Sequence, residues 1–400
     1  MSKLLLQNGI LVFADLILEN GYVYIEHKKI VQLGQGSLDV GDDVRVIDVK
    51  KMFISPGFID MHVHGGGGYD FMDGTVEAFL GVSETHVRFG TTAMCPTTLT
   101  AEKAHIYTVL DTYAEALFHN KRGASWLGLH LEGPYLAMGQ RGAQDPQHIR
   151  NPDEKEYKDI LAYSPHIIRW SAAPELPGAL EFATYLRSKG AIPSLAHTDA
   201  LFEEVVVGYN GGFRLATHFY SAMSTIVRRD AKRYAGVIEA GYYLDGMDVE
   251  IIADGIHVPS SLLKLIYKIK GPDRIALVTD AMRAAAMPEG PSVLGRLEDG
   301  LQVIVEGGVA KLPDRSAFAG SVSTANQLVR NYMRMAEISL MEAVRMITET
   351  PARILGVEDT KGSLRRRKDA DIVVFDQQLE VYITIVEGDI KYDRLTEIKL

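Results

Sequence analysis

The sequence predicts an α/β protein: a (β/α)8 TIM barrel with a small β-sandwich domain formed by both chain termini. Three observations predict this architecture. The middle of the chain alternates short apolar runs with stretches of helical character, both ends are rich in β-type runs, and histidines and carboxylates recur where the apolar runs end. Strands that alternate with helices indicate parallel βαβ units.

Eight apolar runs supply the predicted barrel strands, and they span residues 54–64, 91–98, 126–134, 167–175, 192–198, 213–220, 248–257 and 274–281. Helices are predicted between them, for example over residues 76–89, 101–118, 176–188 and 260–270. Eight strand–helix units are the number that closes a TIM barrel. A doubly wound sheet is the alternative, but no Gly-x-Gly-x-x-Gly sequence follows the first predicted strand, which argues against a dinucleotide-binding sheet.

The two ends of the chain predict the small domain. Residues 1–55 contain short β-type runs with turn signals at Asn8-Gly9 and Asn20-Gly21. Residues 356–400 contain two more runs, with a hairpin predicted at Glu387-Gly388. We therefore expect a β domain made of residues 1–55 and 356–400, and a barrel made of residues 56–355.

Residues 282–320 interrupt the alternation. This stretch contains Pro288, Pro291, several glycines and the hairpin-like run LQVIVEGGVAKL. It is predicted to be an insertion after the eighth strand, at a place where a lid over an active site can lie.

Composition and charge narrow the function classes. The chain is 46% hydrophobic and 24% charged, as a globular protein is, and its formal net charge of −10 argues against nucleic-acid binding. No apolar run reaches the roughly 18 residues of a membrane helix. Polar residues interrupt the apolar start of the chain and no signal-peptide cleavage site follows, so a cytoplasmic protein is expected. Cys95 is the only cysteine, which excludes an internal disulfide.

Residues of the types that bind metals stand at the ends of six of the eight apolar runs. They are His62 and His64, Glu132, His197, His218, Asp254 with His257, and Asp280. In a parallel barrel the carboxyl ends of all strands meet on one rim, where barrel enzymes have their active sites. The sequence therefore predicts that these side chains converge.

Each of these residues has an ordinary structural explanation when it is taken alone. A single buried histidine is more often a hydrogen-bonded core residue than a ligand, Glu132 before Gly-Pro can cap a loop, and Asp280 can cap the next helix. His62 and His64 share one face of a strand, because alternate residues point the same way. Recurrence at one end of most strands favours a shared site over separate structural roles.

The donor types indicate a hydrolytic metal site. Nitrogen and oxygen donors without thiolates suit divalent zinc, iron, manganese or cobalt, and a His–carboxylate set with room for water is typical of catalysis. Such an ion lowers the pKa of water from about 15.7 towards about 7. A carboxylate must then take a proton from the water and later deliver one to the leaving group. Asp280 is the candidate for this role.

Two other features have simpler explanations. Gly65 to Gly68 can surround a phosphate, but no Lys-Ser/Thr pair follows, so a bend of the chain after the first strand is favoured. Arg228 and Arg229 lie beyond His218 and are predicted to be exposed, with an anion clamp as the alternative.

Seven motifs follow one another along the chain: PGFIDMHVHG (56–65), GLHLEGPY (128–135), LAHTDA (195–200), ATHFYSAM (216–223), ADGIHV (253–258), LVTDAM (277–282) and AGS (319–321). Together, and in this order, they resemble the N-acetylglucosamine-6-phosphate deacetylase family of the amidohydrolase superfamily. The resemblance covers almost the whole chain. It implies a hydrolase of amino-sugar catabolism that converts N-acetylglucosamine 6-phosphate to glucosamine 6-phosphate and acetate.

The resemblance also implies roles at the metal site. Glu132, His197 and His218 are implied to hold the main divalent ion, and Asp280 to be the general base and acid. Some family members keep the first-strand His-x-His pair and bind a second ion. Because His62 and His64 are intact, the resemblance implies one or two ions per subunit.

The implied substrate-binding residues are Gly133, Gln144, Ser221, Ala222, Arg229 and His257. His257 is implied to orient the acetyl carbonyl or the phosphate. In the family, the arginine at the position of Arg229 reaches the phosphate in the neighbouring subunit's site, which implies a homodimer.

Two positions depart from the family pattern. Ser221 stands where family members often carry Asn, and Gln144 where they often carry His. A Gln can hydrogen-bond but cannot take up a proton as His does. N-acetylgalactosamine 6-phosphate therefore stays open as the substrate, as do another amide substrate and a metal-binding sensor without turnover. The intact Asp280 argues against the sensor.

Overall fold

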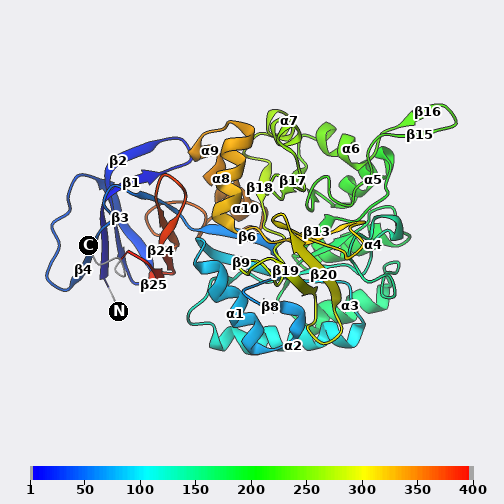
Figure 1. Cartoon of the computed structure of the whole chain (residues 1–400), viewed down its shortest axis with the longest axis horizontal. Coiled ribbons are helices and arrows are strands. Elements are labelled where there is room, and N and C mark those ends of the chain that lie inside the picture. Colours follow the sequence, from blue (N-terminus) through cyan, green and yellow to red (C-terminus); the bar gives the residue numbers. More distant parts are fainter. Residues whose placement is uncertain (1–2, 396–400) are drawn as a thin grey trace.

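Eight parallel strands form the barrel in the computed structural model, which describes residues 3–395 (Figure 1). They are β6 (Phe58–Val63), β9 (Thr91–Thr98), β11 (Leu129–Glu132), β12 (Ile167–Ala172), β13 (Ile192–Leu195), β14 (Leu215–Ala216), β17 (Asp248–Ile251) and β18 (Ile275–Leu277). Neighbours pair in this order, and the short strand β10 (Ser125–Trp126) also pairs with β9. The barrel nearly closes, because the backbone N–H of Asp280 donates to the carbonyl of His62 at 2.9 Å. The barrel prediction is confirmed.

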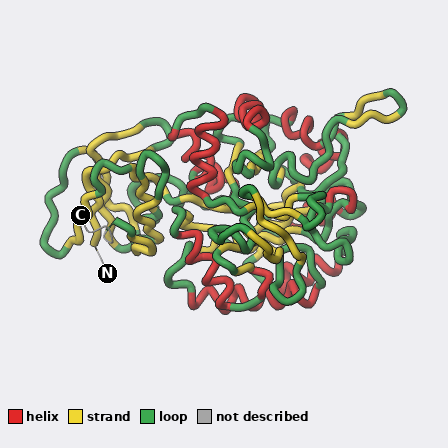
Figure 2. The backbone as a smooth tube through the Cα atoms, viewed as in Figure 1, coloured by secondary structure: helices red, strands yellow, loops and turns green. Residues whose placement is uncertain are grey.

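One helix follows each barrel strand and packs outside the barrel (Figure 2). These helices are α1 (Val76–Val87), α2 (Lys103–His119), α3 (Glu154–Tyr163), α4 (Ala179–Ser188), α5 (Phe202–Gly211), α6 (Val237–Tyr243), α7 (Ser260–Lys270) and α8 (Ala325–Ala336). Two more, α9 (Leu340–Ile347) and α10 (Glu349–Ile354), complete the helical set after α8. Within residues 3–395, no helix combines the length and the apolar character needed to cross a membrane.

The barrel strands are buried on both faces, so their apolar and their polar side chains alike are shielded from water. All residues of β9 are buried, and its alternate side chains belong to different clusters. Met94 packs in the main core beneath the helices, whereas Cys95 packs with Met61, Leu215 and Val278 inside the barrel. The period-two geometry of a strand produces this division.

Strands from both ends of the chain form one mixed sheet, as predicted. They are β1 (Lys3–Val12), β2 (Ile17–Glu26), β3 (Lys29–Gln35), β4 (Val44–Asp48), β5 (Phe53–Pro56), β23 (Ile372–Phe375), β24 (Val381–Val386) and β25 (Asp389–Asp393). The sheet order is β25-β24-β23-β5-β1-β2-β3, with β4 also paired to β1. Apolar side chains from both termini share a separate core, in which Leu6 and Val23 pack with Ile372 and Ile383. The β24–β25 hairpin turns at Glu387-Gly388, as predicted.

The predicted turns at Asn8-Gly9 and Asn20-Gly21 are wrong. Both pairs lie inside strands, where Gly9 faces Gly21 at an irregularity of the β1–β2 ladder. Asn8 and Asn20 have φ values of 58° and 52°, so they mark bulges and not reversals of the chain. A Cβ atom on Gly9 would lie 2.3 Å from Cδ1 of Ile54, so close packing against β5 also requires this glycine.

The predicted insertion is a small antiparallel sheet that lies over the end of the barrel (Figure 1). Its strands are β19 (Gly290–Leu294), β20 (Leu301–Glu306), β21 (Val309–Lys311) and β22 (Phe318–Ser321). The predicted hairpin is β20–β21. Val303, Val305 and Ala310 form a cluster with Met282, which anchors the sheet to the chain that leaves β18.

The glycines after β6 form a tight turn, as expected for a bend. Two short strands, β7 (Gly65–Gly66) and β8 (Tyr69–Asp70), pair across Gly67 and Gly68, whose φ values are 65° and 93°. Short 3-10 turns follow at Phe71–Asp73 and later at Met138–Gln140.

Candidate metal centre and active site

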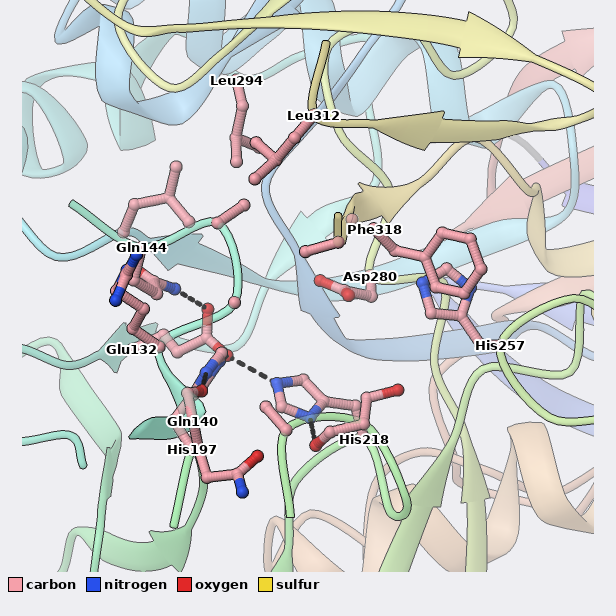
Figure 3. Close-up of a pocket in the computed structure, with 18 of the residues that line it drawn as sticks. Glu132, Gln140, Gln144, His197, His218, His257, Asp280, Leu294, Leu312 and Phe318 are labelled. Carbon is pink, nitrogen blue, oxygen red and sulfur yellow. Dashed lines mark hydrogen bonds and ion pairs between the residues drawn. The ribbon is translucent and has the colours of Figure 1, made fainter. Parts of the chain in front are cut away.

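A cavity of about 590 Å³ opens at the carboxyl ends of the barrel strands. Its lining includes His64, Glu132, His197, His218, His257 and Asp280. Figure 3 shows Glu132, His197 and His218 together on one side, with Asp280 and His257 facing them. His62 is fully buried behind this surface. The predicted convergence of strand-end residues is thus observed.

Glu132, the last residue of β11, is the centre of the cluster. Its Oε1 lies 2.9 Å from Nε2 of His218 and 3.3 Å from Nε2 of His197. Its Oε2 lies 3.5 Å from Nε2 of His64 and accepts a hydrogen bond from Nε2 of Gln144 at 2.8 Å. One carboxylate therefore contacts histidines from three other strand ends.

Asp280 faces the His62–His64 pair. Its Oδ1 lies 3.1 Å from Nε2 of His64 and 3.4 Å from Nε2 of His62. These two Nε2 atoms are 3.2 Å apart, and that of His62 is 3.6 Å from Oε1 of Glu132. The histidine pair therefore lies between two carboxylates.

Each of the four imidazoles is held through Nδ1. The acceptors are the carbonyl oxygens of Gln140 for His197 (2.8 Å), Thr97 for His64 (3.2 Å) and Ser221 for His218 (3.2 Å), and the carboxylate of Glu250 for His62 (3.4 Å). Because these oxygens only accept hydrogen bonds, each Nδ1 carries a proton. Each Nε2 is then the atom that faces the centre of the cluster, which is the arrangement of metal-binding histidines.

Two candidate metal ligands and the candidate general base have left-handed backbone conformations. The φ value is 46° at His197, 30° at His218 and 47° at Asp280. Such conformations cost about 1–3 kcal/mol each in non-glycine residues and persist where the surroundings enforce them. All three residues stand just beyond a strand, where the turn of the backbone brings the side chain onto the cavity wall.

The carboxylates and histidines of the cluster stabilise each other's charged forms. Burial alone would raise the pKa of Glu132, but His62, His197 and His218 outweigh burial and hold that pKa well below its ordinary value. Burial also opposes ionisation of Asp280, whose pKa is nevertheless lowered by His62 and His64. Burial lowers the pKa of His64, yet Asp280 and Glu132 together raise it to about 9. Both carboxylates are therefore ionised at neutral pH, the form that binds a cation or accepts a proton.

Among the residues that the structure describes, two groups of side chains fit a divalent ion. His62, His64 and Glu132 form one group, and Glu132, His197 and His218 form the other, with the ligand atoms of each within 4.8 Å of one another. All members are buried, and nitrogen and oxygen donors without thiolates suit zinc, iron, manganese or cobalt. Because Glu132 belongs to both groups, the arrangement fits two ions that share one carboxylate.

His257, Ser221 and Ala222 border the same cavity. Nδ1 of His257 lies 2.6 Å from Oδ2 of Asp254, which leaves Nε2 for a ligand. The ring of His257 packs 4.7 Å from the ring of Phe318, on β22 of the insertion. Ser221 and Ala222 are half-buried beside His218. The position of these residues agrees with their predicted contact to substrate, which itself stays a prediction.

Gly133 and Gln144 have structural partners in addition to their predicted substrate contacts. Gly133 has a φ value of 85°, and a Cβ atom there would lie 2.2 Å from Oγ1 of Thr100. Gln144 lines the cavity, but its amide N–H donates to Glu132 and its Oε1 accepts from the backbone N–H of Thr100 at 2.8 Å. Gln144 therefore holds the Glu132 carboxylate in place, whereas Gly133 lets the chain pass close to Thr100.

Arg229 lies away from the cavity of its own chain. It belongs to the hairpin of β15 (Val227–Arg229) and β16 (Lys232–Tyr234), which projects from the barrel (Figure 1). The predicted exposure of Arg228 and Arg229 is confirmed. The contact of Arg229 with a neighbouring subunit stays a prediction.

Sequence reasoning missed three charged residues inside the barrel: Asp60, Arg169 and Glu250 are at most 1% exposed. Burial raises the pKa of Asp60 to about 7, while Oγ1 of Thr279 donates to it at 2.5 Å. Burial alone would also raise the pKa of Glu250, but Arg169 and His62 lower it to about 2. The sequence did contain an indication of these residues, because each is a charged residue within a predicted barrel strand.

Comparison with known proteins identifies relatives. A model of the amidohydrolase family matches residues 53–391. The chain is 34% identical to the N-acetylglucosamine-6-phosphate deacetylase of Vibrio furnissii over 88% of this chain and 86% of that protein. It is 32% identical to the N-acetylgalactosamine-6-phosphate deacetylase of Escherichia coli over 87% of this chain and 90% of that protein. A variant of N-acetyl-D-glucosamine-6-phosphate deacetylase from Mycobacterium smegmatis, solved in complex with N-acetyl-D-glucosamine-6-phosphate, is 28% identical with a TM-score of 0.88 over 98% of this chain and 100% of that chain.

Proposed function

Because the chain belongs to the N-acetylglucosamine-6-phosphate deacetylase family of the amidohydrolase superfamily, we propose that it hydrolyses the N-acetyl group of N-acetylglucosamine 6-phosphate. The products are glucosamine 6-phosphate and acetate. One observation carries the proposal: the ionised Asp280 lies 3.1 Å from His64, beside two His/Glu groups that fit divalent ions. Amide hydrolysis needs a proton acceptor and an electrophilic site in one cavity.

Asp280 is assigned the proton transfers. Its lowered pKa keeps the carboxylate ionised at neutral pH, so it can accept a proton from the attacking water. The oxygen of that water bonds to the acetyl carbon, the C–N bond breaks, and Asp280 returns the proton to the amine nitrogen. A divalent ion bound by the clusters supplies the Lewis acidity that activates the water and polarises the acetyl carbonyl.

His257 is assigned to hold the substrate. Asp254 fixes its ring through Nδ1, so Nε2 keeps one direction without a further change of rotamer. A ring fixed in advance loses little conformational entropy when the substrate binds.

The insertion gives the cavity an apolar cover. Leu294, Leu312 and Phe318 line it from the side opposite Glu132 and His218 in Figure 3. An apolar cover reduces the water around the reacting atoms, which strengthens the electrostatic interactions of Asp280 and of the metal-ligand clusters.

N-acetylgalactosamine 6-phosphate is the second candidate substrate. A specific observation supports it: both polar ends of Gln144 are engaged inside the protein, with Glu132 and Thr100. Gln144 therefore directs its hydrogen-bonding groups to the protein at a position where many family members carry His. The relative from Escherichia coli bears the name of this second activity.

We assign the phosphate contact to Arg229 of a second copy of the chain. The projecting hairpin also carries Arg228, Lys232 and Arg233, so it presents concentrated positive charge away from its own barrel (Figure 1). This assignment requires a homodimer in which each hairpin reaches the other cavity.

The test is acetate release by purified protein from the 6-phosphates of both N-acetylated sugars and from the unphosphorylated sugars. Phosphorylated N-acetylglucosamine should have the highest kcat/KM, and a chelator should abolish turnover until a divalent ion is restored. Equal rates with and without the phosphate would reject the sugar-phosphate assignment in favour of another amide. Tight binding without acetate release in metal-loaded protein would identify a sensor.

A further inference from the structure

A buried ion pair lies inside the barrel beneath the metal-ligand cluster. Arg169 on β12 and Glu250 on β17 have no exposed side-chain surface. Burying two charges costs several kcal/mol per ion even when they are paired, and apolar replacements of such pairs are often neutral or stabilising. Stability alone is therefore a poor explanation for this pair.

Arg169 holds Glu250 in one orientation. Nη1 and Nη2 donate to the two oxygens of Glu250, the latter at 2.9 Å. The other donors are engaged as well: Nε with Oγ of Ser194 at 2.9 Å, Nη1 with the carbonyl of Met61 at 3.1 Å and Nη2 with Oγ1 of Thr217 at 2.8 Å. All five N–H groups of the guanidinium therefore have acceptors. A carboxylate held in this way cannot rotate without breaking two charge-assisted hydrogen bonds.

Glu250 also accepts hydrogen bonds from the metal-ligand cluster. Its Oε2 lies 3.4 Å from Nδ1 of His62 and accepts from the backbone N–H of His218 at 3.3 Å. An ionised carboxylate only accepts, so Nδ1 of His62 carries the proton and Nε2 keeps its lone pair. Nε2 is the atom that faces His64, Asp280 and Glu132.

Among the four clustered histidines, His62 is the one whose Nδ1 faces a carboxylate. The other three have neutral carbonyl oxygens at Nδ1. A negatively charged partner raises the basicity of an imidazole more than a carbonyl does, and such partners orient the ring of a ligand. The first-strand pair thus differs from the Glu132–His197–His218 group in having a carboxylate at Nδ1 of one of its histidines.

We propose that Glu250, locked by Arg169, is the positioning residue that makes His62 a ligand and so establishes a second divalent ion at the His62–His64–Glu132 group. The ion at Glu132, His197 and His218 should depend less on this pair, because Glu250 contacts His218 through its backbone N–H and not through its imidazole. The inference rests on the metal chemistry of the proposed function and not on the identity of the sugar.

The test is a metal titration of three variants, read as ions bound per chain and as the affinity of each site. Glu250→Gln has one acceptor oxygen in place of two, so it must present an N–H group to Arg169 or to His62, both of which donate. We expect the weaker ion to lose about 10- to 100-fold in affinity while the tighter ion changes by less than about threefold. Arg169→Met combined with Glu250→Leu removes both charges together and should fold even where the single variant does not. It should show the same selective loss.

The control is Asp371→Asn, which breaks another buried ion pair, between Asp371 and Lys361 at 2.6 Å, in the loop that leads into β23. It should unfold at a lower temperature and still bind both ions like the parent. Equal weakening of both sites in the Glu250 variants, or unchanged binding at both, would overturn the inference. So would a parent protein that binds a single ion, even if it releases acetate. A parent that binds two ions but deacetylates no sugar would refute the proposed function and leave this test intact.

Discussion

Replacing Asp280 with Asn is the sharpest test of the catalytic assignment. The exchange keeps the size of the side chain and removes its negative charge and its proton affinity. Asp280 is not a member of either group of candidate ligands, so both groups remain whole in Asp280→Asn. Loss of activity with retained metal would therefore report on the proton transfers.

The expected magnitude follows from the contacts of Asp280. General acid–base catalysis contributes about 10²- to 10⁴-fold, which corresponds to roughly 3–5 kcal/mol of activation free energy. The amide has no proton affinity at neutral pH, so the whole contribution should be lost. Its NH₂ group would also replace an acceptor that now lies 3.1 Å from Nε2 of His64. We therefore expect kcat to fall by at least 10²-fold, with a smaller change in KM.

The assay is initial acetate release at saturating substrate, with bound metal measured on the same samples. Asp273→Asn is the matched control, because this side chain is 62% exposed and pairs with Arg345 outside the cavity. It should retain the parent kcat. A metal-loaded Asp280→Asn protein that keeps more than about a tenth of the parent kcat would refute the role of Asp280 as the general base.

Three further predictions concern pH, backbone geometry and the phosphate. In metal-free protein the pKa of His64 is raised in the folded state from its ordinary value of 6.5 to about 9. Protonated His64 therefore stabilises the folded state fully below pH 6.5, and this contribution is lost as the pH rises through 9. The shift corresponds to about 3 kcal/mol, and urea unfolding with chelator should show a loss of that order between pH 6 and pH 9.5; a stability that stays constant or rises across this window would contradict the reasoning. Gly133→Ala should reduce the unfolding free energy by more than about 2 kcal/mol and weaken metal binding, because the new Cβ meets Thr100. Gly190→Ala is the control, because Gly190 has a φ of 81° and open space around it. It should show only the backbone cost of about 1–2 kcal/mol. Arg229→Ala should raise KM for sugar phosphates by about 10-fold or more and leave the reaction of unphosphorylated sugars unchanged, with Arg228→Ala as the control; equal KM values in the two variants would remove Arg229 from the phosphate site.

The barrel could be predicted from the sequence because parallel strands buried on both faces have a distinctive pattern. Runs such as residues 91–98 contain no charged residue, and helices of ordinary length separate them, so the eightfold alternation is visible without coordinates. Turn signals were less reliable. The Asn-Gly pairs at residues 8 and 20 satisfy a left-handed backbone, but that conformation serves a bulge as well as a turn, and only the partner strand distinguishes the two.

The sequence by itself determined which chemical groups are present and at which strand ends they stand. The convergence of the candidate ligands Glu132, His197 and His218 could be predicted in advance, because a parallel barrel brings all carboxyl ends of its strands to one rim. Only the tertiary structure decided what those groups contact. Gln144 contacts Glu132, and Arg169 and Glu250 pair beneath His62. The partners in these contacts are more than 10 residues apart in the sequence, yet their atoms lie within 3.4 Å of each other. Hydrogen bonds act over such short distances, and no local sequence pattern encodes which distant side chains the fold will place within reach.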